Sequence, residues 1–198
     1  GIGEWCHPLH TVDINDAGLR SSVQNGILNT ELGIPFRTPA EGHNVAFTSL
    51  WDNYPDSLEI PLKGKASRAY LLMAGSTNHM QCHIDNGVIR IYYKDGTRDV
   101  MFLRNPDNWP PIEHIFFEDG LAFNRHTPAL YRLRLKTGEI SNNFGEELGF
   151  PGASRELDGG AAVLLEMPLN PGKKLSHLVL ETLSNDVVIG LMSITLQR

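Results

Sequence analysis

The sequence predicts an all-β fold, a single β-sandwich with long loops and little or no helix. Three observations lead to this prediction. Apolar runs of strand length recur along the 198 residues and are separated by Gly, Pro, Asn and Asp. One run, residues 69–74, is apolar on both of its faces, as a strand covered by two layers must be. No segment shows the caps and the periodicity of an amphipathic helix of about ten residues or more.

The sandwich is expected to assemble around residues 57–80. This stretch holds two apolar runs, residues 58–62 and 69–74, joined by a polar segment in which Gly64 lies between two lysines. Glycine adopts positive φ angles at low cost, so Gly64 suits a sharp change of direction. The two runs form either a hairpin or a crossing from one sheet to the other.

Before this stretch, residues 45–48 are a short strand candidate. Residues 27–36 are interrupted by Gly33 and Pro35, so they indicate an edge strand or an irregular connection. After it, Asn86-Gly87 predicts a turn into a strand at residues 88–93.

The strongest hairpin signal is Asp95-Gly96, which joins residues 88–93 to residues 99–103. Residues 104–128 follow as a long irregular segment, and such segments in compact domains are often functional. This segment is therefore the first place to look for a site.

The remaining strands close the domain. Residues 131–136 alternate, which predicts Tyr131, Leu133 and Leu135 on the core face and the three cations between them in water. The last three strands are predicted at residues 161–167, 175–183 and 187–196.

Composition excludes several classes of protein. A net charge of −6 opposes binding to phosphate backbones, so nucleic acid is not an expected partner. No apolar run approaches the roughly 18 residues of a membrane span, so no membrane insertion is expected. The chain shows no linker and no repeat, which indicates one domain over residues 1–198. It begins with Gly1 instead of Met, so we expect a domain excised from a larger protein.

Several segments resemble the galactose-binding-domain-like jelly rolls found in bacterial glycoside hydrolases. The resemblance rests on Gly-Ile-Pro-Phe at 33–36, Leu-Glu-Ile-Pro-Leu-Lys-Gly-Lys-Ala at 58–66, Ala-Tyr-Leu-Leu-Met-Ala at 69–74, Ile-Tyr-Tyr-Lys-Asp-Gly at 91–96, and the closing pair at 178–183 and 188–196. It implies an accessory module that binds a glycan or braces a catalytic domain of the same polypeptide. It also implies a periplasmic or extracellular setting and, often, a structural calcium ion.

Sugar binding requires exposed aromatic faces beside planar polar groups. Two loop clusters offer this combination, with Arg125 and His126 as further rim residues. The candidates are Trp51, Asp52, Asn53, Tyr54, Asp107, Asn108, Trp109, Arg125 and His126. The alternative for both tryptophans is that they plug the open ends of the sandwich.

Metal sites are a further possibility. Histidine and cysteine occur together in Cys6-His7-Pro8-Leu9-His10 and in Cys82-His83, but the His-x-His spacing of metal-binding cupin barrels is absent. Calcium would need several oxygen ligands, and the candidates are Asp52 with Asp56, or Asp13, Asn15 and Asp16. Cys6 and Cys82 permit one disulfide or two thiols, and the sequence leaves this open.

An enzyme is the third hypothesis. Glycoside hydrolysis needs two carboxylates, and Glu113, Glu118 and Asp119 lie in the long segment. The chain has no nucleophile elbow, no phosphate-binding glycine loop and no dinucleotide fingerprint. The sequence therefore favours a non-catalytic carbohydrate-binding module of a polysaccharide-degrading enzyme, with a structural domain that braces the catalytic domain as the alternative.

Overall fold

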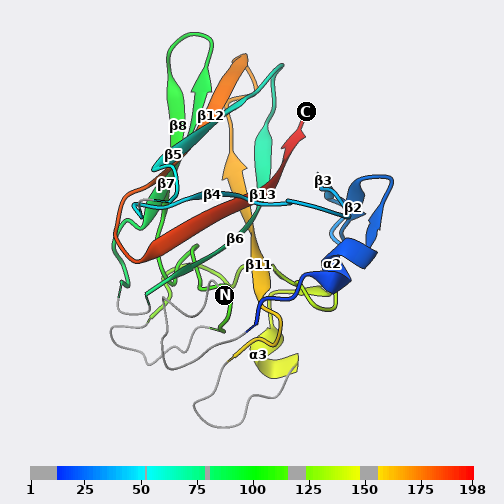
Figure 1. Cartoon of the computed structure of the whole chain (residues 1–198). Helices are drawn as coiled ribbons and strands as arrows, with labels where there is room; N and C mark the ends of the chain where they lie inside the picture. Colours follow the sequence, from blue (N-terminus) through cyan, green and yellow to red (C-terminus); the bar gives the residue numbers. More distant parts are fainter. Residues whose placement is uncertain (1–12, 52, 79–80, 116–123, 148–155) are drawn as a thin grey trace.

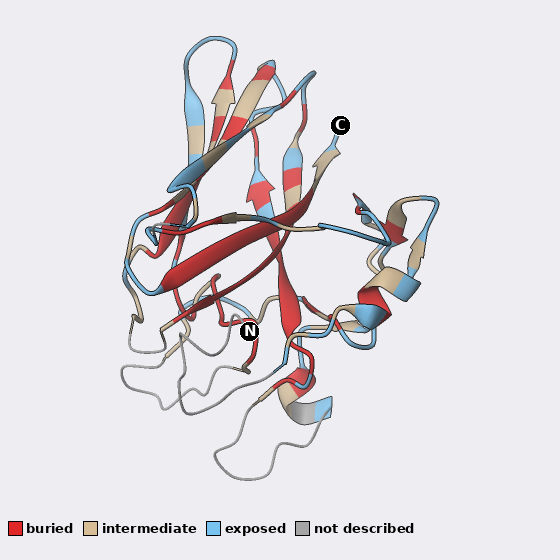
Figure 2. Cartoon of the chain, in the orientation of Figure 1, coloured by how far each residue is buried: buried red, intermediate tan, exposed pale blue. Residues whose placement is uncertain are grey.

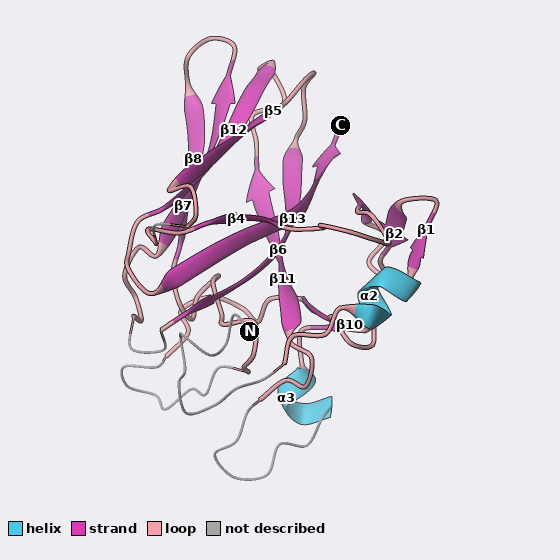
Figure 3. Cartoon of the chain, in the orientation of Figure 1, coloured by secondary structure: helices cyan, strands magenta, loops and turns pink. Residues whose placement is uncertain are grey.

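A computed structural model describes residues 13–51, 53–78, 81–115, 124–147 and 156–198. These residues form an all-β sandwich of antiparallel sheets (Figures 1 and 3). The six-stranded sheet has the order β10 (Ile140–Ser141), β9 (Arg132–Arg134), β11 (Ala161–Pro168), β6 (Arg68–Thr77), β13 (Val187–Gln197), β4 (Ala46–Thr48). The four-stranded sheet has the order β5 (Ser57–Pro61), β12 (Leu175–Thr182), β7 (Gly87–Tyr93), β8 (Arg98–Leu103).

A small third sheet lies beside the sandwich. It consists of β1 (Val23–Gln24), β2 (Ile27–Asn29) and β3 (Pro35–Arg37), and it follows the short helix α2 (Ala17–Ser21). The segment at residues 27–36 thus contains two short strands. The second helix in the described residues, α3 (Phe144–Glu147), is a single turn.

Strand β6 is central, as its apolar character on both faces predicts. It pairs with β11 on one side and with β13 on the other. Leu71 and Met73 belong to the core between the two large sheets, whereas Leu72 and Ala74 face a second cluster under α2, β2 and β3. Figure 2 shows most of β6 and β13 as buried. Burial on both faces explains why the strand needs no polar alternation.

The two runs of residues 57–80 lie in different sheets, so the connection through Gly64 is a crossing and not a hairpin. Gly64 has a φ of 82°, and its carbonyl accepts a hydrogen bond of 2.8 Å from the Leu175 amide. The crossing therefore links the two layers at this end of the sandwich.

The Asp-Gly hairpin between β7 and β8 is confirmed. Gly96 has a φ of 85°, and the Tyr93 amide donates to the Thr97 carbonyl at 2.9 Å. The Asp95 carboxylate accepts hydrogen bonds from the hydroxyl and the amide of Thr97 at 2.6 Å and 3.0 Å. These bonds, with the Lys173 ammonium, lower the pKa of Asp95 to about 2.

The predicted pattern of residues 131–136 is wrong at its start. Leu133 and Leu135 are buried, but Tyr131 is exposed and Arg132 lies inside. The Arg132 guanidinium donates to the carbonyls of Pro111 and Ala161 at 2.8 Å and 2.9 Å, which offsets the cost of burying its charge. Burial still lowers the pKa of Arg132 to about 10.

Candidate functional site

Four loops meet at one end of the sandwich. The Ser49 hydroxyl, after β4, donates to the Val187 carbonyl of β13 at 2.7 Å. The Leu183 amide, after β12, donates to the Asn86 carbonyl before β7 at 3.0 Å. The loop between β6 and β7 in turn contacts the segment after β8, because the His83 amide donates to the Asn105 carbonyl at 2.7 Å.

A layer of buried hydroxyl and amide groups lies beneath these loops. The Thr77 hydroxyl donates to the Asn86 side-chain oxygen at 2.5 Å, and the Thr48 and Thr182 hydroxyls are 2.8 Å apart. The Ser76 hydroxyl lies 2.8 Å and 2.9 Å from the two oxygens of Glu113. Because buried polar groups cost stability unless they are paired, this layer holds the ends of the strands in fixed positions.

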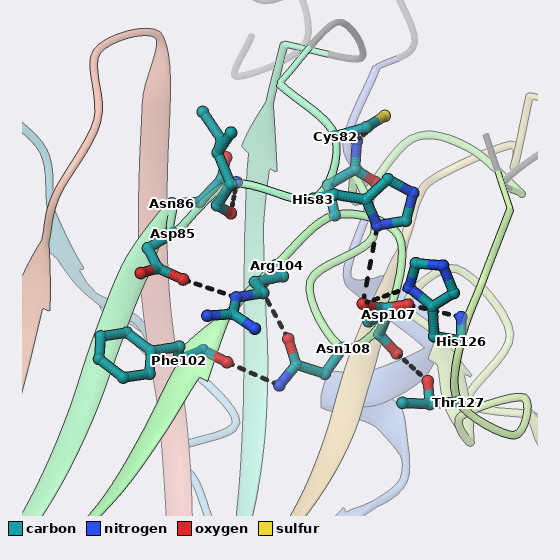
Figure 4. A network of polar contacts seen from close by, with 12 residues as sticks. Cys82, His83, Asp85, Asn86, Phe102, Arg104, Asp107, Asn108, His126 and Thr127 are labelled. Atoms are coloured by element: carbon teal, nitrogen blue, oxygen red, sulfur yellow. Dashed lines mark hydrogen bonds and ion pairs between the residues drawn. The ribbon is translucent and has the colours of Figure 1, made fainter. Parts of the chain in front are cut away.

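Asn86 shapes the loop that carries His83. Its side-chain amide donates to the carbonyls of Gln81 and Ile84 at 3.2 Å and 3.0 Å. Figure 4 shows Asn86 a few residues along the same loop from His83. His83 itself has a φ of 56°, in the left-handed region that few non-glycine residues adopt. The turn thereby directs the His83 imidazole toward the segment that follows β8.

That segment presents Asp107. Asn105 and Pro106 are joined by a cis peptide bond. The Asn108 side chain closes the turn, since its oxygen accepts from the Arg104 amide at 2.7 Å and its nitrogen donates to the Phe102 carbonyl at 2.8 Å. The sequence predicts Asn108 as a sugar ligand, but both polar atoms of its side chain are hydrogen-bonded to backbone groups.

Asp107 is in turn fixed by the segment that carries His126. Its Oδ1 accepts a hydrogen bond of 2.7 Å from the His126 amide, and its carbonyl accepts one of 2.6 Å from the Thr127 hydroxyl. The other oxygen, Oδ2, lies 3.8 Å from His83 Nδ1 and 3.5 Å from His126 Nδ1. The two imidazole centroids are 4.5 Å apart. Figure 4 shows both rings on the same side of the carboxylate.

The His83, Asp107 and His126 cluster unites residues that were assigned separately in the sequence. Asp107 and His126 were sugar-binding candidates, and His83 was a metal candidate. No spacing signal joins them, because they come from three different segments. The cluster could be predicted only if it were known that the β6–β7 loop contacts the β8–β9 connection.

The expectation that Trp109 offers a face to a sugar is wrong. Its side chain is fully buried in the core between the two large sheets. The Ile112 amide donates to the Gly75 carbonyl at 2.9 Å, which brings the segment against β6. A Cβ on Gly75 would lie 2.8 Å from the Trp109 ring, so the ring occupies the space that this glycine leaves. Trp109 fills an end of the sandwich, the alternative that the sequence left open.

Trp51 has a different environment. Its side chain is 38% exposed in a tight turn, closed by a hydrogen bond of 2.9 Å from the Tyr54 amide to the Trp51 carbonyl. Asn53 is exposed, and the half-buried Tyr54 packs edge-on against Phe47 with centroids 6.3 Å apart. Asp52 lies outside the described residues.

Arg125 lines a neighbouring cleft of about 150 Å³, together with Pro106, Leu130 and Phe144. Glu113, a candidate acid of the enzyme hypothesis, is buried beneath the loops. Burial raises the pKa of Glu113, while the Ser76 hydroxyl and the Arg132 charge act in the opposite direction. Glu118 and Asp119 lie outside the described residues.

Two of the three calcium candidates near α2, Asn15 and Asp16, are engaged with protein groups, and the third, Asp13, is exposed. The Asp16 carboxylate accepts from Arg20 Nε at 2.8 Å and from the Asn44 amide at 2.9 Å. The Asn15 side chain accepts from the Ala17 amide at 3.0 Å. Arg20 lowers the pKa of Asp16, and this carboxylate therefore serves as an ion-pair partner. The alternative calcium pair includes Asp52, outside the described residues.

Cys6, His7 and His10 also lie outside the described residues, so the disulfide with Cys82 stays a hypothesis. Neither of the two described helices has the length and apolar character that a membrane-spanning helix requires.

Comparison with known proteins gives no relative for this chain: no family model, no curated protein and no solved structure matches it. The resemblance to galactose-binding-domain-like modules stays a prediction, and the function has to be argued from the site.

Proposed function

We propose that this sandwich is a non-catalytic carbohydrate-binding module of a polysaccharide-degrading enzyme and that the Trp51 loop forms its sugar-binding surface. As part of such an enzyme it would act in the periplasm or outside the cell. The observation that carries the proposal is the exposure of Trp51 at the loop end, two residues before the exposed Asn53.

The loop is suited to binding because it is held at its neck. The Ser49 amide donates to the Pro55 carbonyl at 3.1 Å, while the Ser49 hydroxyl is bonded to β13. An indole in a fixed position stacks on the apolar face of a pyranose with little loss of conformational entropy, and the amide of Asn53 supplies both a donor and an acceptor for ring hydroxyls.

A second aromatic surface lies on the outer face of the four-stranded sheet, but it is less suited to a sugar. Tyr92 stacks on His177 with centroids 4.6 Å apart and an interplanar angle of 13°. The Arg98 guanidinium lies 5.8 Å from the centroid of the same ring. Neighbours on the sheet already pack on this ring, which favours the Trp51 loop.

The test is affinity electrophoresis of the chain through gels that contain plant, algal and host polysaccharides. We expect one polymer to retard the chain and Trp51→Ala to lower the affinity by about fivefold or more, on the scale of the roughly 1–3 kcal/mol that a ring stacked on an aromatic side chain contributes. Tyr131→Ala is the matched control, because Tyr131 is also 38% exposed but adjoins β9, near the opposite edge of the six-stranded sheet from β4.

Retardation that is equally strong in Trp51→Ala would reject the Trp51 surface. Absence of retardation by every polymer would favour the second candidate, a structural domain that braces a catalytic domain. One observation supports that candidate: Val100 and Phe102 on β8 are 43% and 42% exposed, on the outer face of the four-stranded sheet.

A further inference from the structure

Three segments of the loop end bring two imidazoles and one carboxylate together. One ligand atom from each of His83, Asp107 and His126 lies within 4.8 Å of those of the other two. We propose that these three side chains bind a divalent transition-metal ion of the zinc class, at a site separate from the Trp51 loop. The proposal does not depend on glycan binding.

The distances fit an ion between the three groups. Zinc lies about 2.0–2.2 Å from imidazole nitrogen and carboxylate oxygen, so two ligands of a tetrahedral ion are about 3.4 Å apart. Asp107 Oδ2 is 3.5 Å from His126 Nδ1 and 3.8 Å from His83 Nδ1. These two separations are longer than good direct hydrogen bonds and lie within a few tenths of an ångström of the tetrahedral spacing. The ligand atoms of the two imidazoles lie within 4.8 Å of each other, so the largely exposed His126 ring would move toward His83 to complete the coordination.

The donor set selects the class of ion. Two imidazoles with one carboxylate suit zinc, iron, nickel or copper, whereas calcium takes six to eight oxygen ligands. The structural calcium implied by the resemblance therefore does not fit this cluster.

The ligands are oriented by hydrogen bonds of the protein. Asp107 Oδ1 accepts from the His126 amide, which leaves Oδ2 directed at the two rings. The backbone of His83 is bonded to Asn105, two residues before Asp107. Hydrogen bonds of this kind hold the metal-coordinating side chains in place and strengthen metal binding.

Solvent reaches the site from one side. The side chain of His126 is 64% exposed, that of His83 is 30% exposed and that of Asp107 is 15% exposed. Three protein ligands leave at least one coordination position for water, as in open zinc sites. A bound ion would also join the β6–β7 loop to two parts of the β8–β9 connection.

Titration calorimetry with zinc tests the proposal. Cys6, His7, His10 and His79 are potential chelators outside the described residues, so the full chain is used with Cys6→Ser, His7→Ala, His10→Ala and His79→Ala in every sample. In this background we expect one equivalent of zinc to bind. His126→Ala and Asp107→Asn should each weaken binding by about 100-fold or more, because each removes a ligand and the loss of an orienting group alone costs about 10–100-fold.

His43→Ala is the matched control, because His43 is exposed on another part of the chain. It should leave the zinc affinity unchanged. The absorption spectrum of bound cobalt provides a second measurement: we expect its visible bands to disappear in His126→Ala and to persist in His43→Ala. Since His126 is largely exposed, its replacement should not change the unfolding temperature in EDTA.

Zinc at about 100 times its Kd should raise the unfolding temperature of the background protein by roughly 5–10 °C, and of His126→Ala by much less. Equal zinc affinities in His126→Ala, Asp107→Asn and His43→Ala would overturn the proposal. A cobalt spectrum that is unchanged in His126→Ala would overturn it as well.

Discussion

At the scale of the residue, identical side chains have opposite environments. Trp51 and Trp109 both adjoin an aspartate and an asparagine in the sequence, yet Trp109 is fully buried and Trp51 is 38% exposed. The difference comes from the neighbour: Gly75 leaves room for the Trp109 ring against β6. Arg132 differs from Arg134 in the same way, because backbone carbonyls converge on its guanidinium.

Glu113 gives a prediction about pH at this scale. Burial raises its pKa in the folded protein, so the folded state holds the proton more tightly than the unfolded state. The stability that Glu113 contributes is therefore fully present below its unfolded pKa, near 4.3, and is lost as the pH rises through the folded value. As the pH rises from 4 to 8, the free energy of unfolding of Glu113→Gln should therefore increase relative to that of the wild type.

Urea unfolding at the two pH values measures this difference, with Glu139→Gln as the control at an exposed carboxylate. A difference between Glu113→Gln and the wild type that is the same at pH 4 and pH 8 would show that burial does not perturb Glu113.

At the scale of the element, β6 determines the architecture. Its two apolar faces require a layer on each side, and its neighbours β11 and β13 supply the hydrogen bonds. At one position of β6, Gly75, the neighbouring atoms leave no room for a side chain. A Cβ on Gly75 would lie 2.1 Å from the Val188 carbonyl oxygen and 2.8 Å from the Trp109 ring.

Gly75→Ala should therefore destabilise the fold by about 1–3 kcal/mol, the cost of overpacking a well-packed core. Gly96→Ala is the comparison, since no atom lies within 4 Å of its Cβ position and only its φ of 85° opposes a side chain. We expect Gly96→Ala to cost roughly 1 kcal/mol. Chemical denaturation gives both values, and a Gly75→Ala effect smaller than that of Gly96→Ala would contradict the close packing.

At the scale of the whole molecule, the six-stranded sheet is shared by two cores. The core between the large sheets includes Trp109, and the core under α2, β2 and β3 includes Phe36. Both residues are fully buried. Because each core uses one face of the same strands, loss of either one should weaken the same cooperative unit.

Trp109→Ala and Phe36→Ala should each lower the free energy of unfolding by about 3–5 kcal/mol, the usual effect of such truncations. In both variants we expect unfolding to remain a single transition. Calorimetry combined with near-ultraviolet circular dichroism measures this. If Phe36→Ala produced a separate early transition, the small β1–β3 sheet would be an independent unit.

Elements whose signals are local can be predicted from the amino-acid sequence alone. The Asp95-Gly96 turn, the two-faced strand at 69–74 and the closing strands follow from turn chemistry and from the spacing of apolar residues, and these act over a few residues. The sequence does not distinguish a hairpin from a crossing at Gly64, because both connections require the same local chemistry.

Which loops contact each other follows from the packed fold and not from the sequence pattern. The burial of Trp109 depends on Gly75, and the inward position of Arg132 depends on the carbonyls of Pro111 and Ala161. The approach of His83, Asp107 and His126 depends on contacts between separate loops. Each of these results from pairs distant in sequence, whose contact is set by the packing of the two sheets and not by any pattern along the chain.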